Sequence, residues 1–256
     1  MSGAADLSCV VDRIERRDSL SALRDLPDES VDCLLTDPPY SSGGMHRSDR
    51  NARTSVKYQR SVADVKPDFF GDNRDQRSYT QWCALWLSEC HRVLKDGAAA
   101  MVFTDWRQIA ATVDAVQMGG FVYRGIVPWI KPAARPQKGK FTASAEYCVW
   151  SSKGGMRNDG PCLRGYFEKA PEPTRDRIHS TQKPVPLIEH MLGICPEGGT
   201  VLDPFMGSGS TAIAAVRTGR HFVGFEVSEE YCRLANERVA AELSQMTIFD
   251  KTMGGE

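Results

Sequence analysis

The sequence predicts an α/β fold in which a mostly parallel β-sheet carries helices on both faces. Short apolar runs of strand length alternate along the chain with longer segments of helical periodicity. A glycine-rich segment, Gly207-Ser208-Gly209, follows one such run and precedes a helical segment, which is typical of ligand-binding α/β folds. Because no internal repeat or interdomain linker is evident, residues 1–256 are expected to form a single domain.

Seven segments are expected to be strands because they are short and apolar. The second of them, Val31 to Thr36, ends at Pro38-Pro39, and a diproline cannot continue a helix or a central strand. The chain must therefore leave the sheet at this point. The strands are expected at residues 8–14, 31–36, 98–103, 121–130, 146–150, 200–202 and 221–225.

Six segments are expected to be helices. The longest internal one places Trp82 and Trp86 on an apolar face, which favours a core position over base stacking for both rings. Gly97 is expected to end this helix, and Ser228 to cap the last one. The helices are expected at residues 19–26, 78–95, 107–118, 184–192, 210–218 and 228–243.

Three stretches are expected to be irregular. Residues 41–76 are polar and without clear period, residues 131–140 form a basic, proline-rich loop, and residues 151–180 are rich in glycine, proline and charge. Long loops without secondary structure are often functional in compact domains.

The bulk composition limits the classes of protein that are compatible with the chain. The net charge is -1 and the pI is near 6.5, so any basic surface must be local. No apolar stretch reaches transmembrane length and the N-terminus lacks a signal-peptide pattern, so a cytoplasmic protein is expected. The eight cysteines include no Cys-x-x-Cys pair, which predicts reduced thiols and no metal site.

The tetrapeptide Asp37-Pro38-Pro39-Tyr40 is the first motif that carries chemistry. It holds a carboxylate, rigid backbone carbonyls and an aromatic ring at the carboxyl end of a strand, where ligands bind in open α/β sheets. The carboxylate and a carbonyl can accept hydrogen bonds from an amine, and the ring can stack on a planar base. The motif therefore predicts a site for a planar base that carries an NH2 group.

The second motif runs from Val201 to Thr211 and contains the glycine loop. Its glycines let the backbone approach a ligand closely, and the following helix offers free N–H groups. Glu226 ends the next strand, where an acid can bind two ribose hydroxyls. The segment Asp203-Pro204-Phe205 disfavours a phosphate ligand, and with it an NAD-linked dehydrogenase, and suits a cationic ligand such as S-adenosylmethionine.

The order of these motifs resembles that of the permuted β-group DNA amino-methyltransferases of bacteria and phages, which use S-adenosylmethionine. In that group the catalytic motif precedes the cofactor motif, as Asp37-Pro38-Pro39-Tyr40 precedes residues 203–209 here. The resemblance extends to residues 17–32 before the first motif and to His179-Ser180-Thr181-Gln182-Lys183-Pro184 before the second.

The resemblance implies a Rossmann-like methyltransferase fold with a seven-stranded sheet and one antiparallel strand. It divides the chain into a catalytic half of about residues 8–150, a short irregular insert of about 151–178 and a cofactor half of about 179–245. It implies DNA as the partner and S-adenosylmethionine as the cofactor, and a homodimer is compatible with it. No metal and no membrane are implied.

The resemblance also assigns roles to residues. Glu226 would bind the cofactor's ribose, Asp18 would lie near its adenine, and the segment around Lys183 would close over its amino-acid end. The implied catalytic residues are Asp37, Pro38, Pro39 and Tyr40. The implied cofactor-binding residues are Asp18, Asp37, Thr181, Gln182, Lys183, Asp203, Pro204, Phe205, Gly207, Ser208, Gly209, Thr211 and Glu226.

The implied reaction is methylation of the exocyclic amine of a flipped base in DNA. An aspartate at the first motif position favours N6 of adenine over N4 of cytosine within this family. Methylation of carbon 5 of cytosine needs a thiolate, and Cys162 lies in an irregular stretch that disfavours this role. An RNA or protein amine methyltransferase and a non-catalytic DNA-binding partner subunit stay open as alternatives.

Two basic loops are candidates for contacts with DNA phosphates, with a solvated basic surface as the alternative. The first directly follows the catalytic motif, and the second is the proline-rich loop. Their candidate residues are Arg47, Arg50, Arg53, Lys57, Arg60, Lys131, Arg135, Lys138 and Lys140. His91 and His221 have no evident partner in the sequence and are expected to be surface or core residues.

Overall fold

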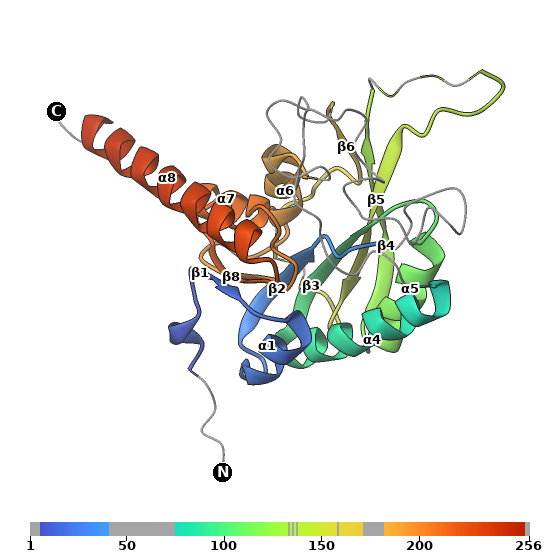
Figure 1. Ribbon diagram of the computed structural model, residues 1–256, viewed down its shortest axis with the longest axis horizontal. Coiled ribbons are helices and arrows are strands. Elements are labelled where there is room, and N and C mark those ends of the chain that lie inside the picture. Colours follow the sequence, from blue (N-terminus) through green and yellow to red (C-terminus); the bar gives the residue numbers. More distant parts are fainter. Residues whose placement is uncertain are drawn as a thin grey trace, which may run out of the picture.

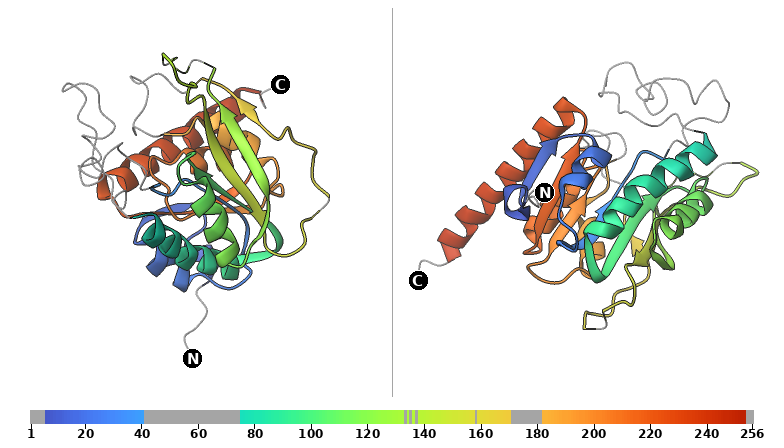
Figure 2. Two further views of the ribbon diagram at one scale, coloured as in Figure 1. Left: turned by 90° about the vertical axis from the view of Figure 1, so that its right-hand side faces the viewer. Right: turned by 90° about the horizontal axis from the view of Figure 1, so that it is seen from below.

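The computed structural model describes residues 6–40, 75–132, 134, 136, 138–157, 159–170 and 182–253. Within them, one eight-stranded sheet has the order β1-β8-β7-β2-β3-β5-β4-β6. Every neighbouring pair is parallel except those of β5, which runs antiparallel to both β3 and β4. The expected α/β fold with one antiparallel strand is thus confirmed. Figures 1 and 2 show the sheet between two layers of helices.

The strands follow the expected apolar segments, with shifts at their ends. Their bounds are β1 Arg13–Arg16, β2 Val31–Thr36, β3 Leu94–Thr104, β4 Val122–Ile130, β5 Ala145–Ser152, β6 Phe167–Glu168, β7 Thr200–Asp203 and β8 His221–Glu226.

The expectation of seven strands is wrong by one, because β6 lies in the stretch expected to be irregular. It has only two residues and pairs with the end of β4. The Lys169 N–H donates to the Ile130 carbonyl at 3.1 Å, and the Trp129 Nε1–H donates to the Lys169 carbonyl at 2.8 Å. A strand that depends on such tertiary contacts has no periodicity of its own to reveal it.

The first expected strand begins later than the sequence indicates. Residues Leu7–Cys9 form a short 3-10 helix that Asp6 caps, and β1 starts only at Arg13. Asp12 lies between them in a left-handed conformation, and its carboxylate is 2.8 Å from Nδ1 of His221. The expectation that His221 is a surface residue is confirmed, since its side chain is 53% exposed, and the pairing of β1 with β8 brings it to Asp12.

The helices occupy the expected segments. Their bounds are α1 Ser19–Asp25, α4 Gln76–Val93, α5 Ile109–Met118, α6 Val185–Leu192, α7 Ser210–Arg217 and α8 Glu229–Met253. Helices α1, α4 and α5 pack on one face of the sheet, and α6, α7 and α8 pack on the other.

Helix α4 ends at Val93, two residues before the expected boundary. Leu94 already pairs with Val31 in the parallel ladder of β2 and β3, so strand pairing replaces the last helical turn. Gly97 does not end the helix as expected. It lies inside β3 with φ +78°, a backbone conformation that favours glycine.

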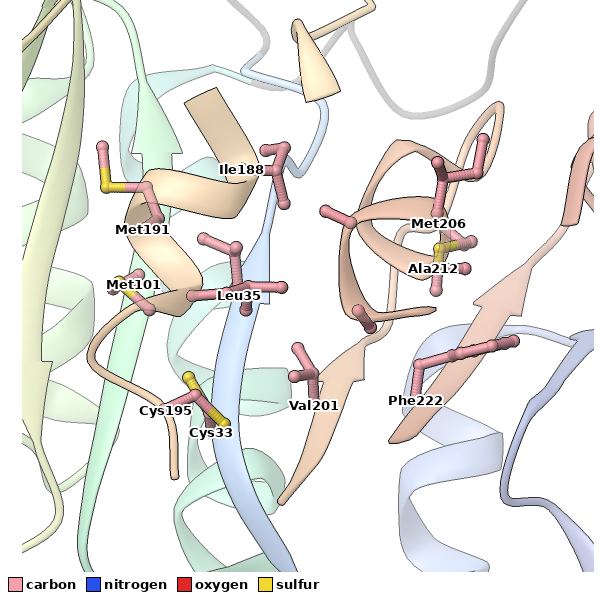
Figure 3. Packing of buried hydrophobic residues seen from close by; sticks show 14 of the residues in the cluster. Cys33, Leu35, Met101, Ile188, Met191, Cys195, Val201, Met206, Ala212 and Phe222 are labelled. Carbon is pink, nitrogen blue, oxygen red and sulfur yellow. The ribbon is translucent and has the colours of Figure 1, made fainter. Parts of the chain in front are cut away.

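The side chains on the two faces of β2 belong to two separate hydrophobic cores. Cys33 and Leu35 pack under α6 and α7, whereas Leu34 packs under α1 and α4. Figure 3 shows the first of these cores, to which Val201 and Phe222 contribute from the sheet and Ile188, Met191 and Ala212 from the helices. Burial on both faces explains why β2 reads as a continuous apolar run.

Among the described residues, no helix combines the length and the apolar character that a bilayer crossing requires. The same part of the chain holds no group of three or more His, Cys, Asp or Glu side chains arranged to bind a metal ion. All eight cysteines are free thiols, and only Cys9 and Cys162 are exposed.

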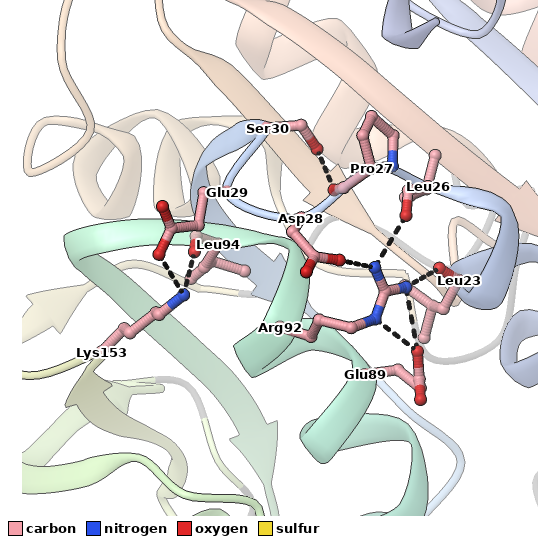
Figure 4. A network of polar contacts seen from close by, with 10 residues as sticks. All are labelled: Leu23, Leu26, Pro27, Asp28, Glu29, Ser30, Glu89, Arg92, Leu94 and Lys153. Atoms are coloured by element: carbon pink, nitrogen blue, oxygen red, sulfur yellow. Dashed lines mark hydrogen bonds and ion pairs between the residues drawn. The ribbon is translucent and has the colours of Figure 1, made fainter. Parts of the chain in front are cut away.

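Arg92, near the end of α4, fixes the connection between α1 and β2 (Figure 4). Its guanidinium donates to the carbonyls of Leu23 and Leu26 at 2.8 and 2.9 Å. It also forms ion pairs with Asp28 and Glu89. Backbone carbonyls at the end of a helix have no intrahelical partner, so one side chain satisfies groups that would otherwise lack one.

We expect Arg92→Met to lower the free energy of unfolding by about 2 kcal/mol, because it removes hydrogen bonds from two backbone carbonyls. Urea unfolding followed by circular dichroism measures this change. Arg233→Met is the matched control, since within the described part of the chain Arg233 pairs with exposed Glu237 one turn away, a contact worth a few tenths of a kcal/mol. Equal losses in the two variants would contradict the assignment.

Candidate active site

The carboxyl ends of three adjacent parallel strands carry acidic residues. Asp37 follows β2, Asp203 ends β7 and Glu226 ends β8, and these strands are neighbours in the sheet. The chain order of the strands changes direction between β7 and β2, and such a switch point is where open α/β sheets bind ligands. The fold therefore gathers both sequence motifs at one edge of the sheet.

Asp203 joins the two motifs directly. Its Oδ1 accepts from the Thr36 hydroxyl at 2.7 Å and from the Phe205 N–H at 3.0 Å. Thr36 and Asp203 are 167 positions apart in the sequence and both are buried. Burial raises the pKa of the Asp203 carboxyl to about 6, although hydrogen bonds from Thr211 and Thr36 oppose the shift.

The glycine loop turns sharply between β7 and α7. Gly207 has φ +54° and Gly209, which caps α7, has φ +84°. A Cβ on Gly209 would lie 3.0 Å from the Ala235 Cβ, so the loop packs closely on α8. At Gly207 an added Cβ would meet nothing nearer than 4.0 Å, so the loop backbone is open on that side.

Glu226 holds the loop from the end of β8. Its Oε2 accepts from the Gly207 N–H at 2.8 Å and its Oε1 accepts from the Ser228 N–H at 2.8 Å. Burial raises the pKa of this carboxyl even though the two backbone donors favour the charged form. The Arg17 N–H donates to the Glu226 carbonyl, which places Asp18 close to the end of β8.

The remaining residues of the expected cofactor set occupy several structural roles. The Asp18 carboxylate accepts from the Ser21 N–H at 2.9 Å and caps α1. Pro204, Ser208 and Thr211 are buried in the loop and at the start of α7. Gln182 is half-buried, and Thr181 lies outside the described residues.

The Phe205 ring packs against two tryptophan rings. Its ring centroid lies 5.4 Å from that of Trp82 and 5.1 Å from that of Trp86, both on α4. Trp86 is buried in the core and Trp82 packs against it, as helical spacing predicts. Sequence spacing does not reveal that these rings also support the glycine loop from the opposite half of the chain.

A lysine fixes the tetrapeptide Asp37-Pro38-Pro39-Tyr40. The Lys183 ammonium lies 2.6 Å from Asp37 Oδ2 and 3.0 Å from the Tyr40 hydroxyl. The Tyr40 hydroxyl donates to the other carboxylate oxygen, Oδ1. Both Asp37 oxygens are therefore hydrogen-bonded. Pro38 is buried, and Pro39 is half-buried beside it.

Lys183 is among the residues predicted to bind the cofactor, and its side chain contacts the tetrapeptide and is only 4% exposed. Burial opposes its charge, yet Asp37 and Glu146 outweigh that effect and raise the pKa of Lys183. Burial in turn raises the pKa of Asp37, although Lys183 opposes this shift. The lysine is thus held as an ammonium between two carboxylates.

Sequence reasoning missed Glu146 as a site residue. It lies at the start of β5, its Oε2 is 3.4 Å from the Lys183 ammonium, and Lys131 forms an ion pair with its other oxygen. The available signal was a carboxylate at the start of an otherwise apolar strand. Only the position of β5 in the sheet shows that this carboxylate faces the catalytic motif.

The basic loop between β4 and β5 emerges at the same edge of the sheet as the catalytic motif. Strand β4 runs parallel to β3 and β2, because β5 is antiparallel to both of its neighbours. Lys138 and Lys140 are exposed, and Phe141 is fully exposed. In Figure 1 the loop projects away from the body of the protein. Arg47, Arg50, Arg53, Lys57, Arg60 and Arg135 lie outside the described residues.

A protein-family model described as DNA methylase, for enzymes that methylate N6 or N4, matches residues 31–237. The chain belongs to this DNA methylase family. The match spans both motifs and most of the sheet. DNA methyltransferases of this family use S-adenosylmethionine as the methyl donor.

Two curated relatives match along most of their length. The chain is 30% identical over 237 residues to the putative methylase YubD of Escherichia coli (strain K12), covering 90% of each chain. It is 29% identical over 247 residues to the type II methyltransferase M2.DpnII of Streptococcus pneumoniae, covering 88% of each.

Solved structures share the fold. The M1.HpyAVI–SAM complex matches with a TM-score of 0.64 and 23% identity over 89% of this chain and 98% of that one. The cytosine-N4-specific PvuII DNA methyltransferase matches with a TM-score of 0.65 and 19% identity over 95% and 93%.

The site fits S-adenosylmethionine, which carries a cationic sulfonium, a ribose diol and an amino-acid end. The loop backbone at Gly207 is open, and the acids Asp37 and Glu226 suit a cationic ligand with a diol. The buried Ser210 hydroxyl at the start of α7 has no hydrogen-bond partner among the described residues, so it can serve a ligand there.

Asp203→Asn should change how stability depends on pH. The folded-state pKa of about 6 lies above the unfolded value of 3.8, so the wild-type carboxyl stabilises the fold most below pH 4 and loses that contribution as pH rises through 6. Relative to the variant, the wild type should lose about 2–3 kcal/mol across this window. Urea unfolding at pH 4.5 and 7.5 measures the difference, and a constant gap between the proteins would contradict the pKa shift.

Proposed function

We propose that the protein transfers the methyl group of S-adenosylmethionine to the exocyclic amine of a base in DNA, with N6 of adenine preferred over N4 of cytosine. The hydrogen bond from Thr36 to Asp203 is the observation that carries the proposal, because it joins the residue before the tetrapeptide to the residue that opens the glycine loop. The family membership supports DNA as the substrate. We also propose one catalytic domain, in which the two halves share the sheet.

The proposed chemistry follows from the acceptors around the target amine. When bound, S-adenosylmethionine supplies an electrophilic methyl group. Asp37 and the Pro38 carbonyl accept from the two N–H bonds, which holds the amine nitrogen in the tetrahedral geometry that attack requires and stabilises its developing positive charge. The proton is acidic after transfer and leaves to solvent. Much of the catalysis is positional.

Tyr40 has two roles in this proposal. In the described structure its hydroxyl occupies Asp37 Oδ1, the oxygen that Lys183 leaves available. Stacking of the ring on a flipped base withdraws that hydroxyl and opens Oδ1 to the amine. Lys183 keeps Oδ2 occupied, so only one oxygen of the carboxylate is presented to the substrate.

The preference for adenine rests on the aspartate at the first position of the tetrapeptide. Within the family, aspartate there occurs mostly with adenine and serine mostly with cytosine. The similar structures include a cytosine-N4-specific enzyme, so likeness of fold does not discriminate between the two bases. Single-molecule sequencing of methylated DNA from an expressing host identifies the base and its context together.

We expect Asp37→Ala to reduce the rate of methyl transfer to unmethylated duplex DNA by a factor of about 100 or more, because the main acceptor for the amine is lost. Transfer of radiolabelled methyl from S-adenosylmethionine measures the rate. Asp114→Ala, at an exposed position on α5, is the control and should keep wild-type activity.

Other outcomes of this assay point to other functions. Full activity of Asp37→Ala would disprove the mechanism. Transfer to RNA or protein in preference to DNA would favour those substrates. Absence of transfer to any of them, together with DNA binding, would indicate a non-catalytic partner subunit.

The basic loop is proposed to contact DNA phosphates beside the target base, and the exposed Phe141 ring is available for stacking there. The double variant Lys138→Gln/Lys140→Gln should weaken DNA binding and reduce the slope of log affinity against log salt by about 2. Fluorescence anisotropy over a salt series measures both changes. Arg233→Gln on α8 is the control, and an unchanged slope in the double variant would exclude the loop from the interface.

A further inference from the structure

The charge around Asp37 presents a problem for the proposed reaction. Positive charge develops on the target amine as the methyl group arrives, and a nearby carboxylate stabilises it. However, the Lys183 ammonium lies 2.6 Å from Asp37 Oδ2, so its charge opposes the negative charge that Asp37 offers. Lys183 fixes the geometry of Asp37 at an electrostatic cost.

Glu146 offsets this cost. Its Oε2 lies 3.4 Å from the Lys183 ammonium, on an element far from both motifs in the sequence. The Glu146 side chain is 25% exposed and Lys183 is 4% exposed, so solvent screens this part of the site weakly. Asp37 and Lys183 alone form a neutral pair, whereas Asp37, Lys183 and Glu146 together carry one net negative charge.

Lys131 acts in the opposite direction. It forms an ion pair with the second oxygen of Glu146, and its ammonium also lies 4.4 Å from the centre of the Trp129 ring. Removal of Lys131 would make the site more negative, whereas removal of the Glu146 charge would make it less negative. The two residues therefore have opposite electrostatic effects on the target amine although they belong to one network.

We infer that Glu146 is a positioning residue for methyl transfer, which acts through Lys183 to preserve the negative character of Asp37 toward the developing charge on the base amine. The inference rests on the proposed function. The negative charge of Glu146 compensates part of the Lys183 charge, so that Lys183 does not fully neutralise Asp37. Glu146 also orients the Lys183 ammonium toward Asp37 Oδ2. It does not touch the base.

Isosteric variants separate charge from shape. Glu146→Gln keeps the size of the side chain and an oxygen that can accept from Lys183, but it removes the charge. Lys131→Gln removes the charge of the other partner. Single-turnover rates at saturating DNA and S-adenosylmethionine report the chemical step without product release.

We expect Glu146→Gln to lower the single-turnover rate about tenfold, with KM for S-adenosylmethionine and thermal stability close to wild type. Lys131→Gln should leave the rate equal to wild type or higher. Glu146→Asp, which restores the charge, should recover part of the loss.

The outcomes discriminate clearly. A wild-type rate in Glu146→Gln would overturn the inference, and equal losses in Glu146→Gln and Lys131→Gln would assign the network a purely structural role. Loss of the rate together with a lower melting temperature in Glu146→Gln, without recovery in Glu146→Asp, would overturn it as well. If the wild-type protein transferred no methyl group to DNA, the proposed function itself would fail, which is a different result from any of these.

Discussion

The pairing of β2 with β7 is the constraint on which the site depends. These strands come from opposite ends of the sequence, and their parallel register places Cys33 beside Val201 and Leu34 beside Leu202. The next residues along each strand reach the Thr36–Asp203 hydrogen bond. One ladder thereby aligns the tetrapeptide with the glycine loop, and apolar side chains on both faces of β2 keep it in place.

Buried carboxylates are the second recurring feature of this edge of the sheet. Asp37, Asp203 and Glu226 each have a raised pKa because burial disfavours their charged forms. Each carboxylate accepts at least two hydrogen bonds. Desolvation is thus only partly compensated, as is common where a protein concentrates charge for binding or chemistry. The stability of this edge and its chemistry are linked through the same atoms.

Local signals predict much of the architecture. The apolar run of β2, the diproline after it and the glycine loop before α7 are visible because each element encodes its own pattern. Elements that depend on partners are not visible in this way. The two residues of β6 form a strand only because Ile130 and Trp129 bind the adjacent backbone. The early end of α4 likewise reflects pairing of Leu94 with Val31.

In the site, too, the residues of contiguous motifs were predictable from the sequence, whereas contacts between distant segments were not. The tetrapeptide and the glycine loop were predictable, because their residues are contiguous. The contact of Glu146 with Lys183 joins strands and loops that lie far apart in the sequence, and no local pattern reports it. The packing of Phe205 on Trp82 and Trp86 was not predictable either. Helical spacing predicts that the two tryptophan rings are buried, but it does not identify the residue that they contact.

The hairpin of β4 and β5 is closed at its base by the hydrogen bond from the Lys131 N–H to the Ser144 carbonyl at 2.7 Å. Below that point the pairing of residues 125–130 with residues 145–150 is unbroken, so the length of the tip should have little effect on the sheet, since closure entropy grows only slowly with loop length. The same base lies one ion pair from Glu146. The hairpin is therefore a suitable grafting point, where a foreign segment can replace the tip while its anchor stays next to the Glu146–Lys183–Asp37 network.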